Sequence, residues 1–240
     1  MASLRPQRGL GLRPQLSDEV AARIRELILD GRVRPGEFLR LERLALEFGI
    51  SVTPVREALQ SLRSEGFVHL EPRRGFVVAS LSKRDVADLF WAQATIGAEL
   101  AARTAERMGP DLLQQLIALQ RALEQATDAG RLDLVEEHNH AFHRTINLAA
   151  DSAKLAWTLG SVVRYVPRGV WTRLPDWPEV ARADHRRILR ALRRKDGPAT
   201  GAAMRQHITR SGELLVAHLE RQGLWRSALD DPGDQRNIGD

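Results

Sequence analysis

The chain contains 240 residues with a formal net charge of +5 at pH 7, and 43% of its residues are hydrophobic and 28% charged. This length suits two domains with buried cores, and no apolar run approaches the roughly 20 residues that a membrane-spanning helix needs. The first residues lack the apolar segment of a secretory signal, and cysteine is absent, which excludes disulfides and thiolate metal sites. We therefore expect a cytoplasmic protein.

The N-terminal third shows a short helical pattern broken by turns. Residues 1–15 are polar with glycine and proline and predict a disordered arm. Apolar residues then recur at helical spacing from Leu16 up to Gly31. A second helix is expected from about Leu39 to Phe48. A third is expected from Thr53-Pro54 to about Glu65, because proline fits only the first turn of a helix.

The period changes after the third helix. Residues 67–70 and 76–79 read as two short strands, and the basic turn 71–75 joins them. Two short helices linked by a glycine turn and followed by a hairpin predict a winged helix-turn-helix over residues 16–80. Everything after Ser82 reads as helix, and the expected segments are 83–108, 110–129, 131–149, 152–170, 178–195 and 198–222. The predicted fold is thus mainly α: a winged helix-turn-helix with a small β-hairpin wing, then an all-α antiparallel bundle over 81–225 and a flexible tail over 226–240.

The helix-turn-helix defines candidate DNA contacts. The later of its two helices, the one expected from Thr53, would enter the major groove. The hairpin would contact the DNA backbone as a wing. The residues expected at this interface are Ser51, Val52, Thr53, Arg56, Arg73, Arg74 and Gly75. Arginine outnumbers lysine, which suits guanine edges and phosphates. GC-rich coding DNA produces the same bias, and single arginines are often merely solvated. The prediction therefore rests on the order of helix, glycine turn, proline-started helix and basic wing along the chain.

The histidines suggest a second site. Asn139 and His143 are four residues apart and share one helix face, while His185 and His207 lie on later helices. Three imidazoles and one oxygen can hold zinc, nickel or manganese. Spacing alone is a weak signal, because seven histidines offer many combinations.

The first third of the chain resembles the GntR superfamily of bacterial regulators. The residues that carry this resemblance are Asp30-Gly31, Arg34-Pro35-Gly36, Leu44-Ala45, Gly49-Ile50-Ser51, Thr53-Pro54-Val55-Arg56-Glu57-Ala58-Leu59, Leu62, Glu65-Gly66 and Arg73-Arg74-Gly75. Position 52 is often arginine in that family. Val52 can make only apolar contact, for instance with a thymine methyl, so the preferred operator should differ.

The remainder is similar to the FCD ligand-binding domain of the FadR-like GntR branch. The matching motifs are Asn139-x-x-Phe142-His143-x-x-Ile146, Asp184-His185-x-x-Ile188-Leu189-x-Ala191-Leu192 and Met204-x-x-His207-Ile208. The resemblance implies a metal at Asn139, His143, His185 and His207 that helps hold a carboxylate effector. Asn139 stands where aspartate is commoner, which should weaken the metal. Gln93 stands where the family often has arginine, which puts the usual effector class in doubt.

These features predict a ligand-responsive transcriptional regulator, most often a repressor in this family. One recognition helix reads few base pairs, so we expect a homodimer on an inverted-repeat operator in double-stranded DNA. The effector should bind near the histidines, with Arg164 on a neighbouring helix as a candidate contact. Two alternatives are a metal-dependent enzyme fused to a DNA-binding domain and a non-specific nucleoid-type DNA binder. The chain lacks the His-Glu-x-x-His and Gly-x-Ser-x-Gly motifs of common hydrolases, which argues against catalysis.

Overall fold

The computed structural model describes residues 16–29, 31–166, 169–222 and 225. The predicted arm 1–15 and tail 226–240 lie outside the described residues. The chain divides into two compact units, Met1–Ser80 and Leu81–Asp240. None of the helices in the described part of the chain combines the length and apolar content needed to cross a bilayer.

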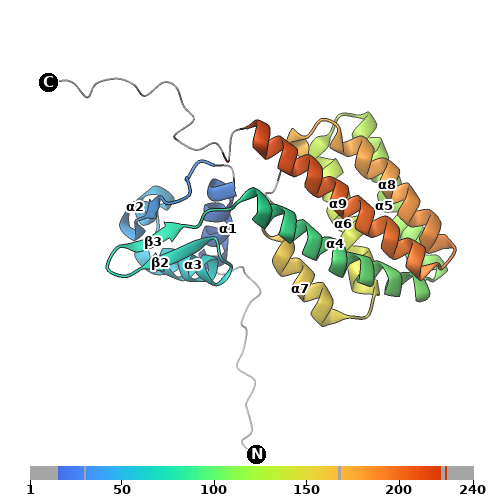
Figure 1. The fold of residues 1–240 in the computed structure, drawn as a ribbon, viewed down its shortest axis with the longest axis horizontal. Helices are drawn as coiled ribbons and strands as arrows, with labels where there is room; N and C mark the ends of the chain where they lie inside the picture. The colour runs from blue at the N-terminus through green and yellow to red at the C-terminus, as the bar shows by residue number, and fades with distance from the viewer. Residues whose placement is uncertain (1–15, 30, 167–168, 223–224, 226–240) are drawn as a thin grey trace, which may run out of the picture. The chain divides into compact units, whose positions relative to one another are not determined.

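The N-terminal unit packs three helices against a small antiparallel sheet (Figure 1). In chain order these elements are α1 (Leu16–Leu29), β1 (Phe38–Leu39), α2 (Leu41–Phe48), α3 (Val52–Ser64), β2 (Val68–Glu71) and β3 (Gly75–Val78). Strand β3 lies between β1 and β2. The core joins α1 to α3, where Ile24, Val55 and Leu59 are fully buried. The winged helix-turn-helix prediction is confirmed.

Strand β1 corrects the predicted start of the second helix. We expected that helix from about Leu39, but it begins at Leu41 because Phe38 pairs with Val77 and Leu39 with Phe76. Two residues are too few to show strand alternation in a sequence. The helix ends as expected at Gly49, whose left-handed φ of 67° suits glycine.

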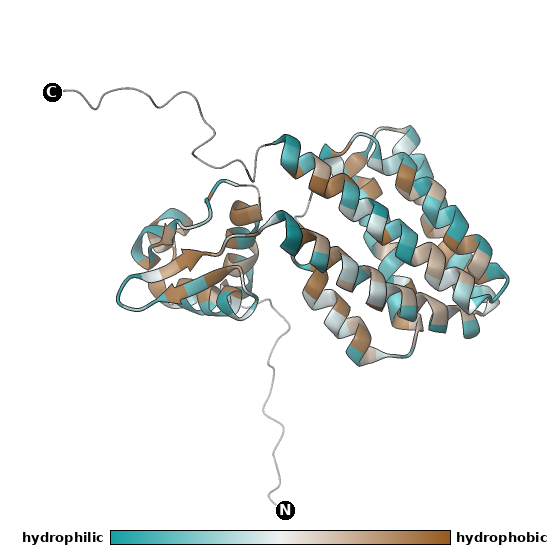
Figure 2. Ribbon diagram, in the orientation of Figure 1, coloured by the Kyte–Doolittle hydropathy of each residue, from teal (hydrophilic) through white to brown (hydrophobic). Residues whose placement is uncertain are grey.

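The C-terminal unit is an antiparallel helical bundle (Figure 1). Its elements are α4 (Lys83–Glu106), α5 (Pro110–Asp128), α6 (Leu132–Ala149), α7 (Ala153–Val163), the 3₁₀ turn η1 (Trp171–Arg173), α8 (Trp177–Arg193) and α9 (Gly197–Arg221). Along these helices polar residues alternate with the apolar residues that fill the interior (Figure 2). The all-α prediction for this part of the chain is confirmed.

Helix α7 is shorter than predicted. We expected one helix over 152–170, but α7 ends at Val163 and η1 follows separately. The sequence has proline at 167, which disfavours helical conformation in the preceding residue. Gly169 then has a φ of 72°, outside the right-handed helical region.

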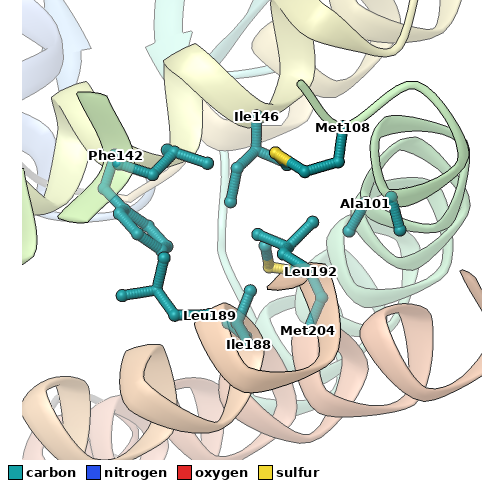
Figure 3. Packing of buried hydrophobic residues seen from close by; sticks show 10 residues of the cluster. Ala101, Met108, Phe142, Ile146, Ile188, Leu189, Leu192 and Met204 are labelled. Carbon is teal, nitrogen blue, oxygen red and sulfur yellow. The ribbon is translucent and has the colours of Figure 1, made fainter. Parts of the chain in front are cut away.

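Helices α4 and α9 run side by side and approach closely (Figure 1). A Cβ atom at Gly212 would lie 2.5 Å from Cγ of Phe90, so only glycine fits there without displacing the ring. Beside this pair, the core of the bundle gathers Phe142 and Ile146 from α6, Ile188 and Leu192 from α8, and Met204 from α9 (Figure 3). This core holds α6, α8 and α9 together at the level where the predicted metal-binding histidines lie.

Candidate functional site

The recognition helix α3 presents the predicted base-reading residues. One side of α3 is buried through Val55, Ala58, Leu59 and Leu62. The opposite side leaves Ser51, Thr53 and Arg56 exposed and Val52 partly buried. Ser51 occupies the cap position in extended conformation, and its hydroxyl forms no capping hydrogen bond. These side chains therefore stand at the end of α3 that meets base edges in this class of domain.

The wing is a tight turn between β2 and β3. The Arg74 backbone N–H donates to the Glu71 carbonyl at 3.1 Å, which closes the turn around Pro72 and Arg73. Arg73 is exposed at the tip with a φ of 65°, and Gly75 has a φ of 102°. The side chain of Arg74 points back: its Nη1 lies 3.0 Å from Oε2 of Glu71, and its guanidinium lies 4.6 Å from the Phe38 ring centre. Both wing arginines are exposed, and Arg74 would have to leave its contact with Glu71 to reach a DNA backbone.

Arg73 occupies a backbone position that glycine would prefer. Replacing Arg73 with glycine should raise the free energy of unfolding by about 1 kcal/mol, because left-handed conformation strains residues that carry a Cβ. The same change should weaken DNA binding at every sequence and flatten its salt dependence. Urea denaturation and fluorescence anisotropy at several salt concentrations measure both effects. An Arg73→Lys control should keep wild-type stability and most of the affinity, and unchanged DNA affinity in Arg73→Gly would contradict the role of the wing.

A hollow of about 560 Å³ brings the two predicted DNA-contact regions to one surface. Its lining includes Arg56 of α3, Arg74 and Gly75 of the wing, Phe38 of β1 and Arg40 directly after β1. Arg40 was not among the predicted contacts. Its place just before the second helix could have suggested it, because cations are common where such helices cross the DNA backbone.

Three histidines from three helices converge in the bundle. His143 of α6, His185 of α8 and His207 of α9 place their Nε2 atoms together, 3.1 Å between His143 and His207 and 3.3 Å between His143 and His185. Each can offer one ligand atom to the same metal ion. Imidazole nitrogens bound about 2.1 Å from one metal lie about 3.0–3.4 Å from each other in octahedral or tetrahedral geometry. The donor set and its spacing therefore fit a divalent transition metal.

Burial favours the neutral form of His143 and His185. His185 is buried, and the Phe142 ring stacks on it at 4.2 Å. His143 is partly buried, but its Nε2 lies between the other two rings. Desolvation, followed by the neighbouring His207, lowers the pKa of both His143 and His185 well below the ordinary value of 6.5. A neutral imidazole is the form that binds a metal.

These lowered pKa values predict how stability depends on pH. When metal-free protein unfolds below pH 6.5, His143 and His185 take up protons that they lack when folded. The free energy of unfolding therefore has its full value above about pH 6.5. It decreases as the pH falls, by up to about 1.4 kcal/mol per pH unit for each histidine. Chemical denaturation between pH 7.5 and 5.5 measures the slope. The slope should be shallower in His185→Gln and unchanged in His138→Gln, which replaces a histidine of α6 that contributes to neither shift. Parallel slopes in wild type and His185→Gln would contradict the assignment.

Further polar side chains surround the histidines. Oε1 of Gln120 on α5 lies 3.0 Å from Nδ1 of His185, and Oδ2 of Asp184 lies 3.6 Å from Nδ1 of His207. Burial acts to raise the pKa of Asp184, but His207 and two arginines outweigh it and hold that pKa below the usual carboxyl value. Neither Gln120 nor Asp184 was among the predicted site residues. Asp184 stands beside His185 in one of the matching motifs, but nothing in the sequence connects it to His207 or connects Gln120 to His185.

The two other predicted site residues differ in their surroundings. Asn139 lies one turn before His143 on α6, and its Oδ1 is buried without a hydrogen-bond partner among the described residues. A buried oxygen of this kind fits a metal or ligand donor. Arg164 is the exposed C-cap residue of α7, so its predicted effector contact has no such support.

Comparison with known proteins follows the same division of the chain. Residues 16–78 match the gntR family of bacterial regulatory proteins, and residues 88–210 match the FCD domain. The chain is 27% identical over 215 residues to the HTH-type transcriptional repressor RspR of Escherichia coli (strain K12), covering 85% of this chain and 90% of that protein. It is 28% identical over 193 residues to the repressor GlaR of the same strain, covering 75% and 87%.

Among solved structures, E. coli McbR/YncC shares the fold with a TM-score of 0.66 at 22% identity, over 86% of this chain and 99% of that one. The matched families and the named relatives are DNA-binding regulators rather than enzymes, which confirms the resemblance seen in the sequence. The chain belongs to the GntR family of bacterial regulatory proteins, with an FCD domain following its helix-turn-helix.

Proposed function

We propose that this regulator is a repressor whose operator affinity is set by a small carboxylate bound beside a metal in the helical unit. The observation that carries the proposal is the convergence of the Nε2 atoms of His143, His185 and His207. Repression is supported by the relatives RspR and GlaR, both of which are named repressors. The helical unit, residues 81–225, would then serve as the sensing and dimerisation domain.

The proposed metal is zinc, nickel or manganese, held by the three histidines with Asn139 as an oxygen donor. A bound divalent cation would supply positive charge for a carboxylate effector. Inside the bundle, Nε2 of buried Gln93 has no hydrogen-bond partner among the described residues. This amide could donate to the effector in place of the arginine that the family often has there. Arg164 remains a candidate contact from its position after α7 alone.

Asn139 gives a direct test of the oxygen donor. Replacing Asn139 with aspartate should tighten metal binding on the order of tenfold, because a carboxylate adds negative charge to the ligand set. Competition with a chromophoric chelator measures the affinity. Gln115→Glu makes the same amide-to-carboxylate change at an exposed position of α5 and should leave the affinity unchanged. Equal affinities in wild type and Asn139→Asp would remove Asn139 from the ligand set.

The protein is proposed to act as a homodimer on an inverted repeat. A single recognition helix contacts too few base pairs to specify one site in a genome, and two helices related by a two-fold axis double that information. The exposed end of α3 with Arg56 would read each half-site.

A nuclease footprint on the DNA upstream of its own gene tests this function. We expect protection of a short inverted repeat at concentrations at least about 10³-fold below those that protect random sequence. Protection of every sequence at one concentration would instead support a non-specific nucleoid-type protein. A monomer on the protected site would refute the two-fold operator.

A further inference from the structure

We propose that Gln120 and Asp184 are positioning residues that hold the protons of His185 and His207 on Nδ1, so that both Nε2 lone pairs face His143 and a divalent cation. This inference rests on the proposed metal site. It concerns residues that do not themselves bind the metal but determine which ring nitrogen is able to do so.

The orientation of the Gln120 amide follows from its neighbours. Its Nε2 donates to Oε1 of Glu124 at 2.8 Å and to the backbone carbonyl of Arg182 at 3.3 Å. A carbonyl can only accept, and the same Glu124 oxygen already accepts from Nε of Arg186 at 2.7 Å. The amide nitrogen of Gln120 must therefore face these acceptors, which leaves its oxygen facing His185.

The tautomer of His185 follows from that orientation. An amide oxygen only accepts hydrogen bonds, so Nδ1 of His185, 3.0 Å away, must carry the proton. A neutral imidazole has one N–H, and Nε2 of His185 therefore has a free lone pair. Because Gln120 and His185 are both buried, water does not compete for this contact.

Asp184 acts on His207 in the same way. Its Oδ1 accepts from Nη1 of Arg187 at 2.7 Å, and its Oδ2 lies 3.6 Å from Nδ1 of His207. These two facing atoms are buried and have no hydrogen-bond partner among the described residues. Although 3.6 Å exceeds a formed hydrogen bond, a small rotation of either side chain closes the gap. A carboxylate can only accept from Nδ1, which again leaves the lone pair on Nε2.

The result is a cluster that needs a cation. Nε2 of His143 lies 3.1 Å from one lone-pair nitrogen and 3.3 Å from the other, and it carries at most one proton. That proton can satisfy only one of the two neighbours, so a buried acceptor remains without a donor. A metal ion at this point would satisfy all three nitrogens at once.

The two contacts differ in chemistry, which suggests two distinct substitutions. Arg187 can only donate hydrogen bonds. In Asp184→Asn, the oxygen of the new amide should therefore face Arg187, and its NH₂ group should face His207. That arrangement moves the His207 proton to Nε2 and blocks it as a ligand. In Gln120→Met, His185 loses its acceptor while the side chain keeps a similar size. Gln115→Met and Asp88→Asn serve as controls, because they make the same changes at exposed positions of α5 and α4.

The test combines two measurements. Nitrogen-15 NMR of the histidine rings in metal-free wild type should show the Nδ1–H tautomer for His185 and His207. Titration with Zn²⁺ against a chromophoric chelator should show affinity reduced about 10- to 100-fold in Asp184→Asn and in Gln120→Met, and unchanged in both controls. The NMR result needs no substitution, so it stands even if a variant fails to fold.

The outcomes separate this proposal from the metal site itself. If wild type binds no Zn²⁺ but shows both Nδ1–H tautomers, the proposed metal site is contradicted. The control of the two tautomers by Gln120 and Asp184 is then still supported. An Nε2–H tautomer on either His185 or His207 in metal-free wild type would overturn the positioning role. Folded variants that bind Zn²⁺ as tightly as wild type would overturn it as well.

Discussion

A protein that carries both His143→Ala and His185→Ala is expected to lose its bound divalent metal. The two substitutions remove two of the three imidazoles whose candidate ligand nitrogens lie within 4.8 Å of one another. The remaining histidine and a neutral amide cannot compete with water for the ion. After mild dialysis, elemental analysis should show metal falling from about one equivalent per chain to under about 0.1.

The control for this experiment removes two other histidines of the same helix. His138→Ala with His140→Ala changes α6 on residues outside the converging set and should retain the wild-type metal content. Circular dichroism should confirm that both double variants keep their helical content. Equal metal content in wild type and the His143/His185 double variant would remove this site from consideration.

Replacing Arg56 with alanine should weaken operator binding by about 1–3 kcal/mol, roughly 5- to 150-fold. Arg56 is exposed one turn into α3, where a guanidinium reaches a guanine edge or a phosphate. Loss of a base contact should also relax sequence preference at one position of each half-site. Loss of a phosphate contact should instead weaken all sequences equally.

Anisotropy titrations with the operator and with single-base variants distinguish these outcomes. Arg63→Ala is the matched control, because Arg63 is exposed in the last turn of the same helix, far from the end that reads bases. Its effect on operator affinity should be small. If Arg56→Ala binds the operator as well as wild type, the assignment of α3 as the recognition helix is wrong.

The sequence predicted the helices of both units well because their apolar residues keep a regular period and their ends are marked. Gly49 and Pro110 each stand at a boundary that the structure shows. Strand β1 escaped prediction because its two residues are paired by β3, a contact distant in sequence. Helix α7 was drawn too long because apolar residues continue past Val163, where the helix ends.

The histidine site shows the same division between local and distant information. Helical spacing could place Asn139 and His143 on one face, and resemblance pointed to His185 and His207. Nothing in the sequence could connect Gln120 to His185, 65 residues later. Asp184 is adjacent to His185, yet neighbouring side chains on a helix point about 100° apart. Its carboxylate therefore faces His207 of another helix, which only the packing of α8 against α9 reveals.

The most direct test of the account is reciprocal linkage between effector and operator. Metal-loaded protein should be screened with small carboxylates, and calorimetry should then be run with and without saturating operator DNA. We expect one acid to change operator affinity by roughly 5- to 150-fold, and operator to change the affinity for that acid by the same factor. This acid should no longer bind when His143 is replaced by alanine. A carboxylate that depends on His143 but binds with identical affinity in the presence and absence of operator would contradict the proposal that this site controls DNA binding.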